Sequence, residues 1–179
     1  MELKGARQDL GKSATRRRSG AFPFELAYRL ISMFSVKGDT VVDPFLGTGT
    51  TLRAAAAAGR DSIGYEIEAG FRPDIFSDLA GLTARANQRI RSRIEEHMAF
   101  IEQRRAAGRD IKHLNRTYRF PVVTRQEIDL LLNPIAAVSP AEHDRFHVTY
   151  SEDPCHAPDP QRSMSTGVPA ETKGQLLLF

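Results

Sequence analysis

The stretch Asp43-Pro44-Phe45-Leu46-Gly47-Thr48-Gly49-Thr50-Thr51 decides the fold. It follows a short apolar run, Thr40 to Val42, and an alanine-rich segment and a second apolar run, Ser62 to Tyr65, come after it. The two runs are typical of parallel strands, and the residues between them predict a helix from about Gly49 to Ala58. A strand–loop–helix–strand unit predicts an α/β sheet that binds its ligand at the carboxyl ends of the strands.

The glycine loop favours S-adenosylmethionine over other nucleoside cofactors. Gly47 and Gly49 let the backbone turn sharply and approach a ligand without a Cβ clash. No lysine follows as in a triphosphate-binding loop, and Leu52 stands where a dinucleotide fingerprint has its third glycine. Asp43 would repel a pyrophosphate, but it would attract the ammonium and sulfonium of S-adenosylmethionine. Glu66 follows at the spacing of an acid that holds ribose hydroxyls.

On the amino-terminal side, helical spacing of apolar residues predicts a helix from Phe24 to Phe34. Its expected inner face consists of Leu26, Leu30, Ile31 and Phe34. Residues 1–20 are polar, basic and without periodicity, so we expect a flexible segment. This segment is either a solvated tail or a DNA contact, and its candidate DNA-binding residues are Arg16, Arg17 and Arg18.

On the carboxy-terminal side the pattern becomes charged and helical. A long helix is expected over residues 79–107, either as a solvated surface helix or as a docking surface for a partner. Its predicted inner face consists of Ile90, Ile94, His97, Met98 and Ile101. Further on we expect a strand over Phe120–Val123, a short helix over Arg125–Leu132 and a strand over Phe146–Tyr150. The cofactor-binding domain is therefore predicted to span residues 21–150.

The last segment, residues 151–179, is predicted to be a disordered linker that leads to an apolar peptide. Apolar residues at the end of a polar linker need a place to dock. They either fold back onto their own domain as an added strand or plug, or form a docking peptide for another protein. The docking peptide is suggested because Gln175, Leu176, Leu178 and Phe179 resemble the motif by which bacterial DNA-processing proteins bind the replication sliding clamp.

Composition is that of an ordinary globular protein, with 41% apolar and 26% charged residues and a net charge of +3. No apolar run approaches the length of a membrane span, and no secretory signal is visible, so we expect no membrane partner. The single cysteine, Cys155, fits a reducing cytoplasm. His143 and His147, with Cys155 and His156 nearby, lack the paired spacing of a metal site, so no metal is expected.

Further motifs surround the glycine loop: Phe22-Pro23-Phe24-Glu25-Leu26, Gly38-Asp39-Thr40-Val41-Val42, Gly59-Arg60 and Ile63-Gly64-Tyr65-Glu66-Ile67. With the loop, they resemble the C-terminal, cofactor-binding half of site-specific DNA amino-methyltransferases, which methylate adenine N6 or cytosine N4. The likeness is tight over residues 18–70 and looser through residues 118–127. It implies a Rossmann-like S-adenosylmethionine-dependent methyltransferase fold, present here in part, with a helical C-terminal extension.

The resemblance also implies roles for individual residues. Phe22 and Pro23 match the segment beside the methionine end of the cofactor, and Glu66 matches the acid that holds the ribose. The cofactor loop corresponds to Asp43, Pro44, Phe45, Gly47, Thr48, Gly49 and Thr50. Phe22 and Phe45 could equally be ordinary core residues.

The family's catalytic motif, Asp/Asn/Ser-Pro-Pro-aromatic, whose ring stacks on the flipped base, does not occur in the sequence. The nearest segment, Asp153-Pro154-Cys155-His156, lacks the second proline and the aromatic ring, and Ser139-Pro140-Ala141 is weaker still. The usual target-recognition region is also missing, so no catalytic residue is assigned. We therefore expect a cofactor-binding half that acts on DNA with a catalytic-half polypeptide. Competing hypotheses are a noncatalytic remnant or binding module, and a methyltransferase acting on RNA or a small molecule.

Overall fold

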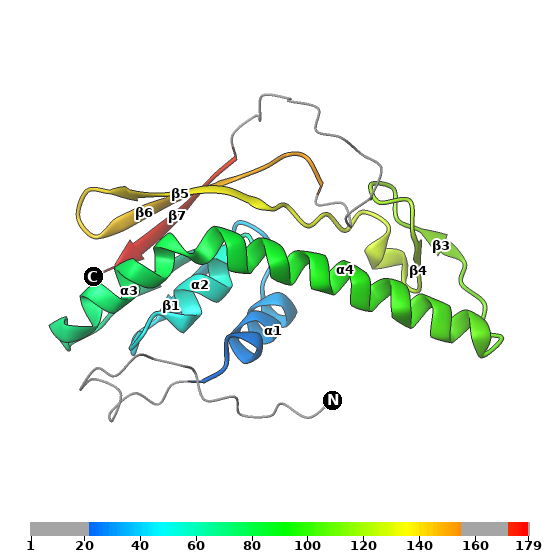
Figure 1. Ribbon diagram of the computed structural model, residues 1–179, viewed down its shortest axis with the longest axis horizontal. Helices are drawn as coiled ribbons and strands as arrows, with labels where there is room; N and C mark the ends of the chain where they lie inside the picture. Colours follow the sequence, from blue (N-terminus) through cyan, green and yellow to red (C-terminus); the bar gives the residue numbers. More distant parts are fainter. Residues whose placement is uncertain (1–21, 155–171, 179) are drawn as a thin grey trace.

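The computed structural model describes residues 22–154 and the backbone of residues 172–178. It contains a five-stranded sheet in the order β1 (Thr40–Asp43), β2 (Asp61–Gly64), β7 (Thr172–Leu178), β6 (Arg145–Tyr150) and β5 (Ile135–Ala141) (Figure 1). The first three strands are parallel to one another, and β6 runs antiparallel to both of its neighbours. The predicted strand–helix–strand unit is confirmed, since helix α2 (Thr50–Ala57) connects the parallel strands β1 and β2.

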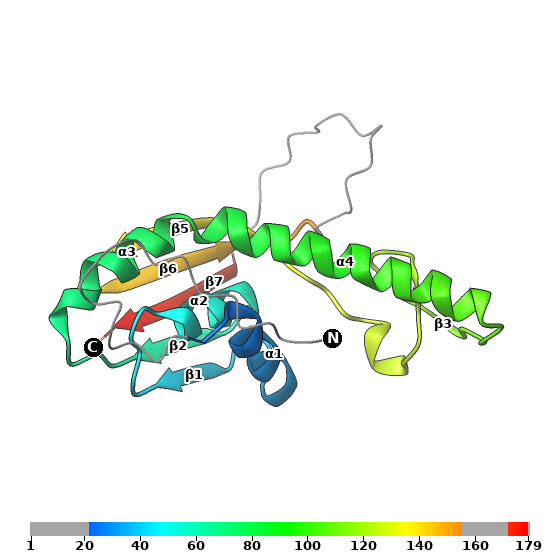
Figure 2. The same ribbon diagram turned by 60° about the horizontal axis from the view of Figure 1, so that its bottom comes forward.

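The main core lies between the sheet and four helices: α1 (Phe24–Phe34), α2, α3 (Arg72–Ala80) and α4 (Leu82–Ala106) (Figure 2). The run of alanines in α2 is completely buried, and its small side chains let this helix lie close to the sheet. Tyr150 of β6 reaches the same helix, where its hydroxyl donates a hydrogen bond of 2.8 Å to the Ala56 carbonyl. Burial raises the pKa of Tyr150, so the hydroxyl keeps its proton at neutral pH.

Helix α1 has the predicted bounds, but its predicted inner face is right only in part: Ile31 is buried and Leu26 half-buried, whereas Leu30 and Phe34 are exposed. The buried residues are Ala27, Tyr28 and Ile31, whereas Leu30 is 47% and Phe34 79% exposed. The helix is rotated because Tyr28 occupies the groove toward α4, where the Arg89 guanidinium lies over its ring at 5.5 Å. Apolar residues of α1 consequently face outward.

Helix α4 confirms most of the predicted long helix, and Ile90, Ile94 and Ile101 are buried as expected. The residues before it form a separate helix, α3, which the sequence pattern did not predict. Figures 1 and 2 show α4 running beyond the sheet and ending beside a second, two-stranded sheet. This small sheet consists of β3 (His113–Leu114) and β4 (Pro121–Val122), paired antiparallel.

Two predictions for this region need correction. The predicted strand over residues 120–123 exists as β4, but it belongs to the small sheet. The predicted helix over residues 125–132 is reduced to one 3₁₀ turn, Arg125–Glu127. The buried Asn115 side chain donates to the carbonyls of Glu127 and Leu130, and the Arg116 amide donates to that of Ile128, so these carbonyls are engaged outside any helix.

The apolar end of the chain enters the main sheet. Strand β7 lies between β2 and β6, as expected if this end folds back as an added strand, and its first residues fall within the predicted linker. The extension is therefore not only helical, because β5, β6 and β7 all join the main sheet. Strand β5 was not predicted, since Pro140 interrupts its pattern, and proline is tolerated there because β5 is an edge strand. The predictions for residues 1–20 and for the linker over 155–171 lie outside the described residues.

We predict that β7 is required for stability. Leu177 pairs with Ile63 of β2 and Arg145 of β6. The substitution Leu177→Pro removes a backbone donor from the interior of the sheet and is expected to cost about 3 kcal/mol or more in the free energy of unfolding. Denaturant unfolding followed by circular dichroism measures this, with Leu177→Val as the control that keeps the donor. Equal midpoints for both variants would place β7 outside the folded sheet.

A second prediction concerns the ion pair between α1 and α4. Burial disfavours ionised Glu25, but hydrogen bonds from Arg89 and Arg29 outweigh it and lower the pKa of Glu25. A lowered folded pKa contributes stability above the unfolded pKa, and that stability is lost as pH falls through the folded value. Glu25→Gln should therefore cost about 1–2 kcal/mol at pH 7, and the difference from the unsubstituted chain should shrink below about pH 4. Exposed Glu95 of α4 provides the control, Glu95→Gln, which should show no such pH dependence.

Candidate cofactor-binding site

The glycine loop lies where the sequence predicts it, at the carboxyl ends of β1 and β2. The Tyr65 amide donates to the Asp43 carbonyl at 2.9 Å, and the Leu46 amide donates to the Tyr65 carbonyl at 2.9 Å. These bonds extend the pairing of the two strands beyond their formal ends. They bring Asp43, the loop and Glu66 together at one edge of the sheet, as the spacing predicts.

Glu66 is bound directly to the loop. Its Oε2 accepts the Gly47 amide at 2.7 Å, and its Oε1 accepts the Glu68 amide at 2.8 Å. An ionised carboxylate has about four acceptor positions. Two therefore remain for other donors, and two neighbouring hydroxyls of a ribose would match them.

The two loop glycines have different roles. Both adopt positive φ, +55° at Gly47 and +77° at Gly49, where other L-residues are strained. A Cβ added to Gly47 would meet no described atom within 4 Å, whereas one added to Gly49 would lie 3.4 Å from the Ile75 side chain. Gly49 thus allows α3 to pack against the loop, and Gly47 leaves open space in front of it.

Thr48 and Thr50 are buried beneath the loop, with 7% and 3% of their surface exposed. The Thr50 hydroxyl accepts a hydrogen bond of 3.2 Å from Arg53, which also forms an ion pair with Asp78 of α3. Burial lowers the pKa of Arg53 to about 10, so its guanidinium remains charged at neutral pH. The threonines therefore brace the loop from inside.

Asp43 is half-buried at this edge and Pro44 is exposed, and Pro23, just before α1, is half-buried. One carboxylate oxygen of Asp43 accepts the Phe45 amide at 3.0 Å, which stiffens the start of the loop. The Phe45 side chain is 88% exposed, so its interpretation as a core residue is wrong, and Phe22 is 36% exposed.

The sequence pattern assigned no role to Ile67, which is fully exposed next to Glu66. Its position in the sequence could have indicated a role, because it is an apolar residue directly after the acid that follows the second strand. Phe45 in the loop and Ile67 directly after Glu66 are therefore two exposed apolar side chains of this region.

The remaining candidate residues do not assemble into a site. His143 lies in the tight turn between β5 and β6 with φ of +56°, and His147 lies within β6, so the two histidines belong to a turn and a strand and not to one helix. Among the described residues, no group of three or more metal-ligating side chains occurs. Asp153 is exposed at the end of the first described range, and Ser139 and Pro140 lie in β5. The candidate DNA contacts Arg16, Arg17 and Arg18, together with Cys155 and His156, lie outside the described residues.

Comparison with known proteins confirms the resemblance to DNA amino-methyltransferases. The model of the DNA methylase family of the N6/N4 type matches residues 5–76. The type II methyltransferase M.MthZI of Methanothermobacter thermautotrophicus is 42% identical over 151 residues, which cover 84% of this chain and 41% of that protein. M.MjaI of Methanocaldococcus jannaschii is 53% identical over 74 residues, 41% of this chain and 24% of its own length.

The chain thus spans less than half the length of these curated relatives. No solved structure matches it significantly. Among the described residues, no helix is long and apolar enough to cross a membrane. The family implies S-adenosylmethionine as the methyl donor, which agrees with the choice made from the loop itself.

We predict that Gly64 cannot be enlarged without moving the loop. A Cβ at this position would lie 2.7 Å from two carbons of the buried Leu46 side chain. Gly64→Ala is expected to destabilise the chain by about 1–3 kcal/mol through this overlap. In a double-mutant cycle on unfolding free energies, Leu46→Ala should relieve the overlap, so the double variant should lose less than the sum of the single variants. Additive losses would contradict the contact.

Proposed function

We propose that this chain is the S-adenosylmethionine-binding part of a site-specific DNA methyltransferase that modifies an exocyclic amine of adenine or cytosine. The observation that carries the proposal is the Glu66 carboxylate held on the Gly47 amide, with open space in front of the glycine. The match to the DNA methylase family and to type II methyltransferases supports the reaction and the substrate class. A partial Rossmann-like fold agrees with the parallel β1–α2–β2 unit.

The polar and apolar groups of the site each match one part of this cofactor. The remaining acceptor positions of Glu66 suit the ribose hydroxyls, and the exposed Ile67 beside it suits the apolar face of an adenine ring. Asp43 keeps a carboxylate oxygen for the cationic methionine end, and the resemblance assigns Phe22 and Pro23 to the same end. Pro44, Phe45, Thr48, Gly49 and Thr50 shape the loop between these two ends. S-adenosylmethionine supplies the methyl group when bound, and the residues of this chain bind and orient it.

The catalytic motif would come from a second polypeptide segment that completes the sheet. Within the described residues β1 is an edge strand, paired only with β2, and Val42 on its outer face is 56% exposed. The described helices pack on the face that contains Val41, Phe146 and Val148. Parallel strands are normally covered on both faces, so this half-covered sheet supports a catalytic-half partner. The matched relatives contain more than enough additional chain to supply it.

Competing functions are less well supported, each on a specific ground. A methyltransferase for RNA or a small molecule gains no support from the comparisons, which match a DNA methylase family and type II methyltransferases. Docking on the sliding clamp would require Gln175 to Leu178 to leave the interior of the sheet. A noncatalytic remnant would have the same cofactor site as a functional half, so the two hypotheses differ only in whether adding a catalytic partner restores methyl transfer.

We predict that the chain binds S-adenosylmethionine in titration calorimetry. Asp43→Ala and Glu66→Gln should each weaken binding by about tenfold or more, because each removes a charged hydrogen-bonding group. Gly47→Val should also weaken it, since the new side chain would enter the open space and strain a residue at positive φ. Glu142→Gln, which removes an equal charge at the exposed β5–β6 turn, is the control. Unchanged affinity in all three site variants would refute the cofactor site.

We further predict that the chain alone does not transfer labelled methyl groups to mixed-sequence duplex DNA, because the Pro-Pro-aromatic motif is absent. Transfer should appear when the part of M.MthZI that lies outside the matched region is added. Substituting Val42→Lys on the exposed face of β1 should reduce this complementation without changing cofactor affinity. Transfer by the chain alone would overturn the assignment of catalysis to a second segment.

A further inference from the structure

Positive charge is concentrated in two parts of the sequence, the amino-terminal residues 1–20 and a second segment within the described residues. Residues 104–125 contain seven arginines and lysines and a single acid, Asp110, for a net charge of +6. The whole chain of 179 residues carries only +3. The chain outside residues 1–20 and 104–125 is therefore net negative, and among the described residues a DNA phosphate would be attracted chiefly to residues 104–125.

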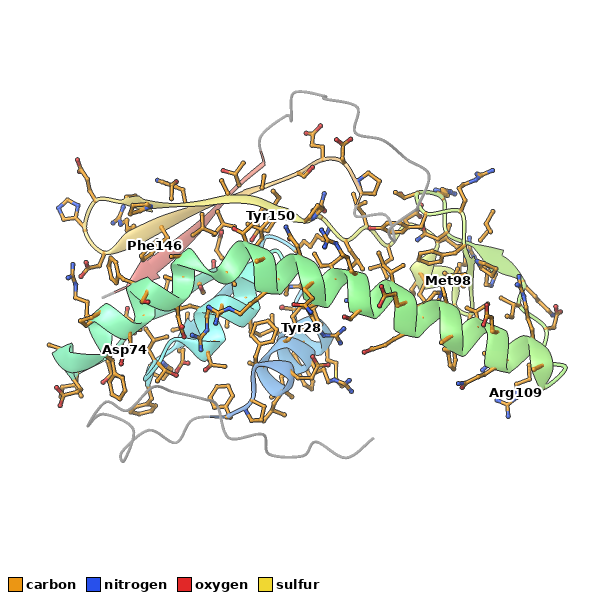
Figure 3. All side chains as sticks on the ribbon, viewed as in Figure 1. Tyr28, Asp74, Met98, Arg109, Phe146 and Tyr150 are labelled. Carbon is orange, nitrogen blue, oxygen red and sulfur yellow. The ribbon has the colours of Figure 1, made fainter. Side chains whose placement is uncertain are left out.

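This segment forms the greater part of a protruding unit that we name the arm, residues 104–133. It begins with the last turn of α4, includes β3 and β4, and stands away from the main sheet (Figures 1 and 2). Figure 3 shows Arg109 at one extremity of the molecule and Asp74 of α3 at the other. The arm is therefore placed to meet a ligand that the cofactor end of the molecule does not reach.

The arm is a built structure with its own core. Tyr118 and Phe120 stack with their ring centroids 5.1 Å apart, and they pack on Ile90 and Ile94 of α4. The Tyr118 hydroxyl donates to the Leu132 carbonyl at 3.0 Å. The backbone that carries the cations is consequently ordered, which lowers the entropy that binding would cost.

A fully buried asparagine fixes the turn at the tip of the β3–β4 hairpin. Asn115 Oδ1 accepts the amides of Thr117 and Tyr118, at 3.0 and 2.8 Å. The turn closes with Arg119 at φ of +59°, a conformation that costs a residue with a Cβ about 1–2 kcal/mol. An exposed arginine thus occupies a position that glycine or asparagine would fill with less strain.

Four exposed arginines of the arm have guanidinium groups without any ion pair or hydrogen bond to the described residues: Arg105, Arg109, Arg119 and Arg125. Arg116 and Lys112 are paired with Asp129 and Asp110 respectively, but all these side chains are strongly exposed, so such pairs contribute little. The acid Glu127 is occupied by the Thr124 amide and hydroxyl. Most of the positive charge on the arm is therefore available to an anionic partner.

We propose that the arm binds the phosphate backbone of DNA at a distance from the base that is methylated. The inference rests on the proposed function, which makes duplex DNA the polyanion that the protein meets. Helix α4 has 25 residues and is about 37 Å long, close to one turn of B-DNA. The arm contacts the backbone on the order of one helical turn from the cofactor end and sets the orientation of the duplex without reading its sequence.

The test compares two variants that lose the same charge. The arm variant is Arg109→Gln with Arg119→Asn, because asparagine tolerates the left-handed backbone at this position. The control is Arg85→Gln with Arg91→Gln, two exposed arginines of α4 that lie outside the arm. Affinity for a duplex of roughly 30 base pairs is measured by fluorescence anisotropy between about 50 and 200 mM salt.

The arm variant should bind DNA roughly tenfold or more weakly near 0.1 M salt, and its salt dependence should fall by about 2 in the slope of log K against log salt. The loss should be equal for duplexes of unrelated sequence, and the control should remain near the unsubstituted chain. Equal effects in both variants, or a loss confined to one sequence, would overturn the proposal. If the arm variant unfolds by circular dichroism, Lys112→Gln with Arg125→Gln replaces it and must give the same result.

S-adenosylmethionine binding is measured on the same samples. If the arm variant binds the cofactor normally and its DNA affinity is unchanged, the proposed role of the arm is refuted and the proposed function is not. Absent cofactor binding in the unsubstituted chain refutes the proposed function and leaves the salt dependence as an independent measure of the arm.

Discussion

The constraint on which the site depends is the continued pairing of β1 and β2 beyond their last regular residues. The Tyr65 amide donates a hydrogen bond to the Asp43 carbonyl at the end of β1, and the Tyr65 carbonyl accepts one from the Leu46 amide in the loop. This double attachment places the Glu66 carboxylate beneath the Gly47 amide, where a single hydrogen bond of 2.7 Å joins the acid to the loop. Without it, the glycines would give the loop freedom without giving it a shape.

The same attachment explains why the interior around the loop is so specific. Gly64 must remain small because Leu46 lies over it, and Gly49, beside Ile75 of α3, has a positive φ at which other residues are strained. Arg53 then joins the buried Thr50 to Asp78, which connects the underside of the loop to α3. Elements that are far apart in the sequence therefore hold one surface open, while the buried hydroxyl and guanidinium beneath it satisfy each other.

Sequence reasoning located this surface because its signals are local. The strand, glycine turn and helix follow within a few residues, and turn chemistry at Gly47 and Gly49 is independent of tertiary context. It failed where long-range contacts decide. The segment after Arg125 has helical periodicity, but the Asn115 side chain donates hydrogen bonds to two of its carbonyls. Strand β7 pairs with β2, which is far from it in the sequence, as well as with β6. The rotation of α1 similarly follows from the fit of Tyr28 against Arg89, which no pattern within that helix reveals.

Charge and apolar surface are separated in this molecule in a way that a self-sufficient domain would not need. The exposed apolar side chains Val42, Phe45 and Ile67 lie on or beside β1 and β2, whereas the excess of positive charge among the described residues lies in the last turn of α4 and beyond it. Apolar surface next to an edge strand favours a protein neighbour, and exposed guanidinium groups on an ordered backbone favour phosphate. Helix α4 keeps these two surfaces apart, because its first residues are packed in the main core and its last turns in the small one. A rigid connection of this kind would hold the proposed cofactor site and the proposed backbone contact at a fixed separation, which loops of the same length would not do.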